Sequence, residues 1–442
     1  MFDYAWPASS AVSWTQLTLT DTYQAEVGHT TQLRAAVESM LARGVQAPLP
    51  VVQAVSEYLP YLVGLAYCIE HDTVLLRQEP ESTWRSILAP QNKVVVRGID
   101  GEQGCLYTLY AIALCNEAKT MVDALGMYEC DASYTTQERR GRDERLKVAT
   151  DMLCRASGVW DAIATSHLPA YQAHASTASA PELNAEGAQG MAKLALGDAH
   201  ALAIRKLKAP AKGRATDLGT AGPPLPADHP SASLLAKLHL HTSHLYDQAH
   251  ALVTQSLGME AKTPIAKIKA YLHTLRLDSS SRGDGVGAWL RYAHTEAVWH
   301  KCLAFKWLGI DAGEHAHNIG WGIAYLTLAL HTLAQIMPSD TSAKLRRTKD
   351  SYDWYVHEHA SIKRWLTAYQ RTNEAVAFQR IPTADEVQLY MSEGRAALAP
   401  KTFTLTPAFG RQPSTVTTMS TTSTTSTTTD TPRTYAGADA YY

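Results

Sequence analysis

The amino-acid sequence predicts a mainly α-helical protein with a small β-sheet near its N-terminal part and a disordered C-terminal tail. Three observations lead to this prediction. Long segments carry apolar residues at the spacing of a helix, one short region is rich in β-branched residues, and the tail from residue 414 begins with an almost pure Ser and Thr segment, 414–429. With 442 residues, 45% of them hydrophobic, the chain can bury a large core.

The elements are predicted in order from the spacing of their apolar residues. Helical spacing predicts helices at 31–41, 51–69, 104–125, 146–163, 191–207, 231–245, 263–275, 288–308, 321–337 and 342–370. Alternating or β-branched segments predict strands at 17–27, 73–77, 83–88 and 93–99, which supply the small sheet. Proline- and glycine-rich composition predicts loops at 165–187 and 209–231. Helices of such unequal length do not form a regular repeat array, so one large helical domain is expected.

Two neighbouring helices, at 191–207 and 231–245, organise this prediction. The first carries two apolar stripes, one made by Met191, Leu194, Ala195, Ala199 and Leu202, the other by Leu196, Ala203 and Leu207. The second has an apolar face made by Leu234, Leu235, Leu238 and Leu245. A surface helix needs only one apolar stripe. The first helix is therefore expected either to be buried between neighbours or to present part of itself to a partner.

Composition and charge restrict the classes of partner. The formal net charge of -2 gives no overall attraction to nucleic acid or anionic lipid. We therefore expect no nucleic-acid partner, and membrane contact only peripherally through partners. No window reaches the roughly eighteen uncharged apolar residues that a membrane span requires, and the N-terminus lacks the basic region of a secretory signal. The six cysteines form no C-x-x-C pair, which indicates reduced core residues of a cytoplasmic protein.

Histidines are the residues that come closest to suggesting catalysis. Three groups stand out among the 18 histidines: His239, His241 and His244; His294 and His300; and His315, His317, His357 and His359. None places two histidines four residues apart on a helix with a glutamate between them, the arrangement of a zinc hydrolase. No catalytic residue, metal or cofactor is therefore predicted. A metal-dependent hydrolase remains a distant alternative.

Several motifs, in the right order along the chain, resemble those of the Bro-domain family, which includes Alix and PalA. They are TWRSIL, LYTLYAIALCNEA, RLKVATDMLCRASGVW, LALGDAHALAIRKL and SASLLAKL. In the C-terminal half, WLRYAHTEAVWHKCLAFKWLGIDAGEHAHNIGWGIAYL and NEAVAFQRIPTADEVQLYMSEGR are similar to the Bro-domain proteins of the fungal ambient-pH signalling pathway. The resemblance covers about residues 20–400. It implies a Bro-type domain at 1–400, followed by a Ser/Thr-rich disordered tail at 401–442.

The resemblance implies a large curved helical domain that acts as a non-enzymatic adaptor in ambient (alkaline) pH signal transduction. An exposed apolar patch on adjacent helices is expected to bind the C-terminal helix of an ESCRT-III subunit. Other pathway proteins would then be recruited to endosomes or the plasma-membrane cortex. Carried across motif by motif, Leu202, Leu235 and Leu238 are the expected apolar contacts, and Lys206 and Lys237 the expected contacts to acidic groups.

Two alternatives remain open for this site. Leu202, Leu235 and Leu238 can instead pack in the core. The chain can also be a generic helical scaffold of the endosomal or ESCRT machinery that binds a different partner, through the aromatic helix around Trp299. These alternatives differ in which side chains the folded protein leaves exposed.

Overall fold

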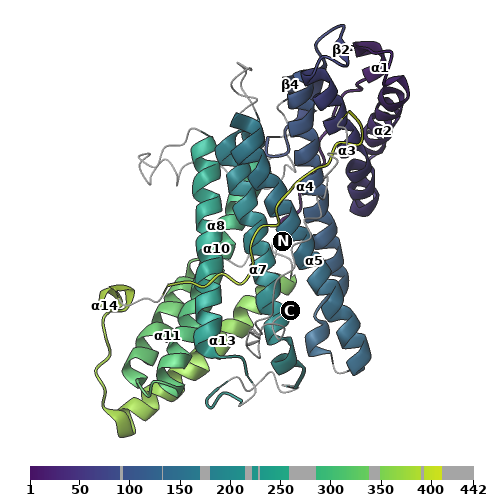
Figure 1. Ribbon diagram of the computed structural model, residues 1–442. Helices are drawn as coiled ribbons and strands as arrows, with labels where there is room; N and C mark the ends of the chain where they lie inside the picture. The colour runs from purple at the N-terminus through teal and green to yellow at the C-terminus, as the bar shows by residue number, and fades with distance from the viewer. Residues whose placement is uncertain are drawn as a thin grey trace, which may run out of the picture.

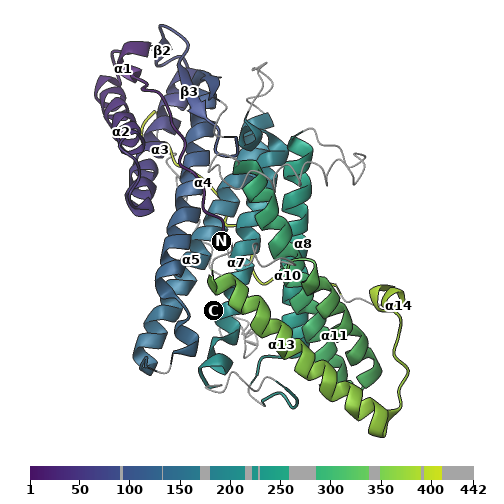
Figure 2. The same ribbon diagram turned by 180° about the vertical axis from the view of Figure 1, so that it is seen from behind.

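The computed structural model describes residues 1–410 apart from 90–92, 132, 170–179, 215–221, 227–228, 258–284, 338–348 and 390–392. Its long helices stand side by side, and each packs mainly against the described helices before and after it in the chain (Figure 1). Seen from behind, α13 (Lys349–Thr372) runs obliquely to the upright helices and lies against α11 (Ile319–Ala334) (Figure 2). The mainly helical fold expected from the sequence is confirmed.

The bounds of the remaining helices, turns and strands are as follows. The other helices are α1 (Trp14–Leu17), α2 (Gln24–Ala42), α3 (Pro48–Glu70), α4 (Gly98–Leu125), α5 (Thr136–Ala162), α7 (Ala185–Arg214), α8 (Ala232–Ser256), α10 (Gly285–Glu314) and α14 (Ala384–Leu389). Short 3-10 turns are η1 (Tyr128–Cys130) and η3 (Pro181–Leu183), and π-helical turns are η2 (Ile163–His167) and η5 (Asn373–Ala377). The strands are β1 (Thr18–Leu19), β2 (Leu75–Leu76), β3 (Glu81–Arg85) and β4 (Lys93–Arg97).

Differences from the sequence prediction concern mainly the ends of the helices. α5 begins well ahead of its predicted start because Thr135 and Glu138 form a capping box. The Thr135 amide donates to the Glu138 carboxylate at 2.8 Å, and the Glu138 amide donates to the Thr135 hydroxyl at 3.3 Å. α7 continues to Arg214, into a segment predicted to be a loop. The helix predicted at 263–275 lies outside the described residues.

The strands form two separate antiparallel ribbons rather than one small sheet. β1 pairs with β2, with Thr18 opposite Leu76. β3 pairs with β4, with Trp84 opposite Val94. The Trp84 side chain is buried, so the second ribbon is attached to the helical core through one face.

Two clusters of buried side chains make up the core. The larger cluster lies among α2, α3, α4, α5 and much of α7, and it includes Trp14, Trp160 and Trp289. The smaller cluster lies among α10, α11, α13 and the start of α8, and it includes Trp365. α7, α8 and α10 contribute residues to both clusters. These three helices therefore join the two halves of the domain.

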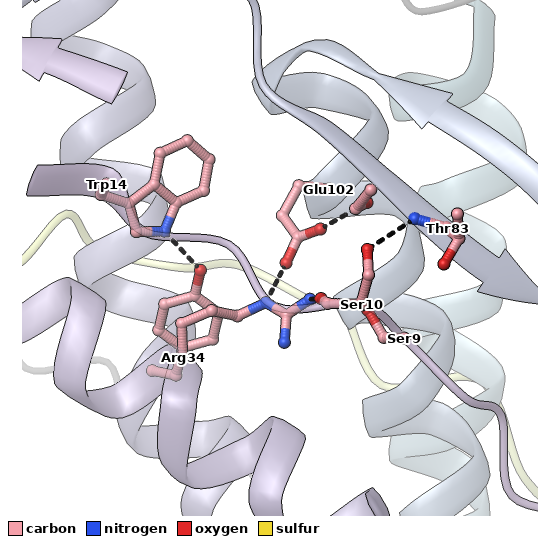
Figure 3. A network of polar contacts seen from close by, with 8 residues as sticks. Ser9, Ser10, Trp14, Arg34, Thr83 and Glu102 are labelled. Atoms are coloured by element: carbon pink, nitrogen blue, oxygen red, sulfur yellow. Dashed lines mark hydrogen bonds and ion pairs between the residues drawn. The ribbon is translucent and has the colours of Figure 1, made fainter. Parts of the chain in front are cut away.

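A buried ion pair attaches the N-terminal segment to the helices (Figure 3). The Arg34 guanidinium on α2 donates to the Glu102 carboxylate on α4, and both side chains are buried. Arg34 also donates to the Ser9 hydroxyl at 2.6 Å and to the Ser10 carbonyl at 2.9 Å. The Ser82 hydroxyl donates to the second oxygen of Glu102 at 3.1 Å. Such added hydrogen bonds offset the desolvation of a buried charge pair.

α3 is long and apolar enough to cross a membrane by length and composition, which the sequence analysis did not expect. In the described part of the chain no other helix meets that criterion. Leu59, Leu62 and Leu65 of α3 are fully buried in the larger core cluster, and α3 packs between α2 and α4. Core packing therefore accounts for the hydrophobicity of this helix.

An extended segment at residues 394–410, here called the strap, crosses one face of the helix array from α8 to α3 (Figure 1). Three of its amides donate to backbone carbonyls: Arg395 to one of α8, Lys401 to one of α5 and Ala408 to one of α3, each at 3.0 Å. Phe409 is buried in the larger cluster. Buried and hydrogen-bonded residues thus continue along the strap beyond residue 400, as far as Phe409. The rest of the predicted tail, 411–442, lies outside the described residues.

Candidate protein-interaction surface

α7 and α8 form a close antiparallel pair because α7 presents glycine to its neighbour. A Cβ at Gly197 would lie only 3.0 Å from the ring of Tyr246, so a larger side chain there would push the helices apart. α8 begins after Ser231, whose hydroxyl accepts a hydrogen bond from the Leu234 amide at 3.4 Å. The relative position of the two helices is therefore fixed by packing and by this N-terminal cap.

The three leucines expected to contact a partner are buried. Leu202 is 6% exposed, Leu235 0% and Leu238 5%. Leu202 belongs to the larger core cluster, and Leu235 and Leu238 belong to the smaller one. They do not form one exposed patch, because a helix that lies between two neighbours buries most of its apolar side chains. The three leucines pack in the core, which was one of the alternatives that the sequence left open.

The two predicted lysines lie in different surroundings. Lys237 is exposed on α8, and its backbone carbonyl accepts the Arg395 amide of the strap. Lys206 is half-buried on α7. The guanidinium of the preceding residue, Arg205, is bonded to the buried carboxylate of Glu129 at 2.7 Å. Lys237 therefore stands at the edge of the strap, where its ammonium group is accessible to an acidic partner.

Accessible apolar side chains lie beside the buried leucines, along the seam between α7 and α8. The rings of His200 on α7 and His241 on α8 are 5.0 Å apart. Two helical turns further, toward the end of α7 and the start of α8, Leu207 and Leu234 occupy equivalent positions. Both are partly exposed and pack against the smaller core cluster. We call these two leucines, with the two lysines beside them, the seam patch.

The strap crosses the seam at His200. Nε2 of His200 accepts the backbone amides of Ala397 and Leu398, each at 3.2 Å, while Nδ1 lies 2.9 Å from the Leu196 carbonyl. Burial lowers the pKa of His200 to about 4, so its imidazole is neutral at physiological pH. The strap therefore crosses α7 and α8 at His200. The seam patch lies beyond that crossing, toward the end of α7 and the start of α8.

A buried carboxylate holds α7 to two other helices. Asp198 on α7 accepts the hydroxyl of Tyr246 on α8 and that of Tyr292 on α10, both at 2.6 Å. Burial raises the pKa of both tyrosines well above its usual value, so both remain donors. The arrangement fixes the three helices and leaves Asp198 itself buried.

Buried histidines of this region pair with one another. Nδ1 of His239 lies 2.9 Å from Nδ1 of His300. Burial lowers the pKa of His300 to about 3 and that of His239 well below its usual value, so both rings are neutral. Among the residues that the structure describes, no three His, Cys, Asp or Glu side chains converge as metal ligands. His239 and His300 therefore contribute a packing and hydrogen-bonding contact between α8 and α10.

The aromatic helix around Trp299 is less available than the sequence suggested. Trp299 is half-buried, and its ring packs edge-on against Tyr355 of α13 with centroids 4.9 Å apart. More exposed apolar side chains follow α13, namely Val376 at 74% and Phe378 at 77%. Phe378 has a positive φ of 50°, and its amide donates to the Asn373 carbonyl at 2.8 Å. A different partner would therefore meet Phe378 more readily than Trp299.

Neither His200 nor the strap was predicted from the sequence to belong to the site. The strap has a sequence signal that was available: Phe403, Leu405 and Phe409 alternate with outward residues at the period of an extended chain. Phe403 and Leu405 pack against the larger core cluster. For His200 the helical pattern carried no such signal, because its partners are backbone amides far away in the sequence.

The BRO1-like domain family model matches residues 15–412. The pH-response regulator protein palC of Cryptococcus neoformans is 30% identical over 398 residues, which cover 81% of each chain. The palC protein of Yarrowia lipolytica is 21% identical and covers 90% of this chain and 92% of its own. That of Emericella nidulans is 24% identical and covers 73% and 64%. The narrower resemblance to the fungal pH-signalling branch is therefore confirmed.

Solved structures share the fold. ALIX in complex with the SIVmac239 PYKEVTEDL late domain superposes with a TM-score of 0.60 at 14% identity, over 91% of this chain and 48% of that chain. The ALIX BRO1 CHMP4C complex gives 0.57 at 12% identity, over 91% and 95%. A structure described as the basis for endosomal targeting by the Bro1 domain gives 0.54 at 12%, over 91% and 92%. This chain thus spans about half of that ALIX chain and more than nine tenths of the other two.

Proposed function

This chain belongs to the BRO1-like domain family, and on that premise we propose that it is a non-enzymatic adaptor of ambient-pH signalling that binds the C-terminal helix of an ESCRT-III subunit. The names of its relatives as pH-response regulators support the pathway. The neighbouring ALIX BRO1 complex with CHMP4C, an ESCRT-III subunit, supports the class of partner. Binding would recruit other pathway proteins to endosomes or the plasma-membrane cortex, with membrane contact through the partner.

The seam patch is the observation on this chain that carries the proposal. A helix docked in a groove needs a few apolar anchors within reach of one helical face. Leu207 and Leu234 offer such anchors on two adjacent helices, and the lysines beside them offer positive charge to an acidic partner. The buried Leu235 and Leu238 hold this surface in place from below. The proposed contact therefore moves from the predicted leucines to their accessible neighbours.

The test is a titration of the full chain with a peptide of the C-terminal helix of an ESCRT-III subunit from the same organism. Leu234→Asp places a charge at the centre of the seam patch, and we expect a loss of about 2 kcal/mol, or roughly thirtyfold in Kd. Leu389→Asp is the matched control, because Leu389 is 82% exposed on α14. Circular dichroism of both variants should remain helical.

Three outcomes separate the alternatives. Binding that Leu234→Asp loses and Leu389→Asp keeps supports the adaptor function and its site. Binding that survives Leu234→Asp and is lost in Phe378→Ser contradicts the site at the seam patch and points to a contact at Phe378, which is exposed. No binding by the unmodified chain contradicts the proposed partner. Leu235→Asp is unsuited to this test, because a charge at a fully buried position would unfold the protein.

A further inference from the structure

The strap is attached to the helix array at few points, and two of them involve titratable side chains, His200 of α7 and Asp151 of α5, which pairs with Lys401. A carboxylate such as that of Asp151 stays ionised between pH 7 and pH 5, whereas an imidazole can change charge in that range. The amides of Arg395, Lys401 and Ala408 donate to backbone carbonyls, which do not change charge. At the seam, the amides of Ala397 and Leu398 both donate to Nε2 of His200. Two consecutive amides of the strap therefore depend on one lone pair of an imidazole ring.

The hydrogen bonds of His200 fix its tautomer. Nδ1 lies 2.9 Å from the Leu196 carbonyl, and a carbonyl can only accept, so Nδ1 carries the hydrogen. Nε2 must then be unprotonated to accept the two amides. A second proton on this ring would point an N–H group at two other N–H groups. Protonation of His200 is therefore incompatible with the strap in its present position.

In the described part of the chain, no carboxylate is bonded to His200 that could compensate for a positive charge on its ring. The charged and titratable groups around His200 and the adjoining strap are His241 from α8, His300 from α10, Asp151 and Cys154 from α5, and Arg395 and Lys401 from the strap itself. The carboxylate of Asp151 is already paired with Lys401. His241 disfavours a charge on His200. Protonation would therefore be relieved by moving the strap rather than by a new ion pair.

We propose that His200 is a proton-operated latch: its neutral imidazole holds the strap on the α7–α8 seam, and its protonation releases this part of the strap. The proposal goes beyond the adaptor function, because it concerns a movement within this chain and needs no partner. Release would uncover the side of the seam next to the seam patch, including the surface now covered by Leu398.

The direction of the pH dependence follows from linkage. Burial lowers the pKa of His200 to about 4 in the strapped form, and the ordinary value of 6.5 applies once the ring is solvated. The strapped form therefore binds the proton more weakly than the released form. Attachment is complete above about pH 6.5 and weakens as the pH falls toward 4. Between pH 7 and pH 5 the release equilibrium shifts by about twentyfold.

Hydrogen exchange of the full chain tests this latch. Protection of peptides from 394–400, corrected for the intrinsic pH dependence of exchange, should fall about twentyfold from pH 7 to pH 5. Peptides from α4 should keep their protection, which separates local release from global unfolding. Equal strap protection at both pH values, or an equal loss in α4, would overturn the proposal.

Two further measurements assign the effect to His200. In His200→Gln, which cannot be protonated, strap protection should be independent of pH, whereas His331→Gln removes an exposed histidine of α11 and should behave like the unmodified chain. A pH-dependent loss that persists in His200→Gln contradicts the latch. Exchange of the imidazole C2 hydrogen, followed by mass spectrometry, gives the pKa of His200 in the unmodified chain. This measurement needs no variant, so it remains available if His200→Gln does not fold. A value near 6.5 would equally overturn the proposal.

Discussion

Replacing Gly158 by alanine tests whether the strap is seated directly on α5. A Cβ at position 158 would lie 1.6 Å from the backbone carbonyl oxygen of Lys401, and contacts below 3.0 Å force something to shift. The strap must therefore move away from α5 by about 1.4 Å or more. Such a shift breaks the hydrogen bond from the Lys401 amide to the Cys154 carbonyl, now 3.0 Å long.

Opposing effects determine the size of the change. Alanine in place of glycine inside a helix stabilises it by about 1 kcal/mol. The lost backbone hydrogen bond costs about 1 kcal/mol, and partial loss of packing by Leu398 and Phe403 costs about 1–2 kcal/mol more. We expect Gly158→Ala to lower the free energy of unfolding by about 1–2 kcal/mol. The sign is opposite to that expected from helix propensity alone.

Gly141 on the same helix offers a matched control. A Cβ at Gly141 meets nothing within 4 Å, so Gly141→Ala should raise the free energy of unfolding by about 0.5–1 kcal/mol. Denaturant titration of both variants, with limited proteolysis of the strap, measures the difference. If both substitutions stabilised the protein equally and left the strap resistant to protease, the seat of the strap on α5 would be refuted.

Further predictions concern the buried polar groups. Arg34→Met leaves a buried carboxylate unpaired and should cost about 3–5 kcal/mol in a urea titration, whereas Arg97→Met, in an exposed pair, should cost less than about 1 kcal/mol; similar costs for the two would contradict the burial argument. Tyr292→Phe removes one of two hydroxyls bonded to Asp198 and should cost about 1.5 kcal/mol, and an unchanged denaturation midpoint would show that this bond contributes nothing. Burial raises the pKa of Glu296 to about 7, so the folded form binds its proton more tightly and this group adds stability as the pH falls through 7; Glu296→Gln should remove that contribution, and identical pH–stability curves would contradict it.

The helices were predictable because their signal is local. The stripes of α7 and the apolar face of α8 follow from residues three and four apart, and both helices are present. Periodicity does not say which stripe a neighbour covers. Leu202 and Leu207 looked equivalent in sequence, yet Leu202 is buried and Leu207 is partly exposed, because α7 lies between two other helices.

Contacts between distant residues were beyond the sequence pattern. Arg34 and Glu102 are 68 residues apart, and neither position looks different from an ordinary surface charge on a helix. The strap could not be predicted from the sequence for a different reason. Its apolar residues are few and follow a proline, so they read as the beginning of a polar tail, whereas the array supplies the seat that lets Phe409 be buried.

The position of the strap has a consequence for how the protein is made. Lys401 reaches Asp151 from 250 residues further along the chain, so the helices on which the strap lies are synthesised long before it. Until the strap emerges from the ribosome, the apolar surface that receives Phe403 and Phe409 is uncovered, and such surface is what chaperones recognise. A nascent chain truncated before residue 394 would keep that surface permanently, and cellular quality control would treat it as unfinished.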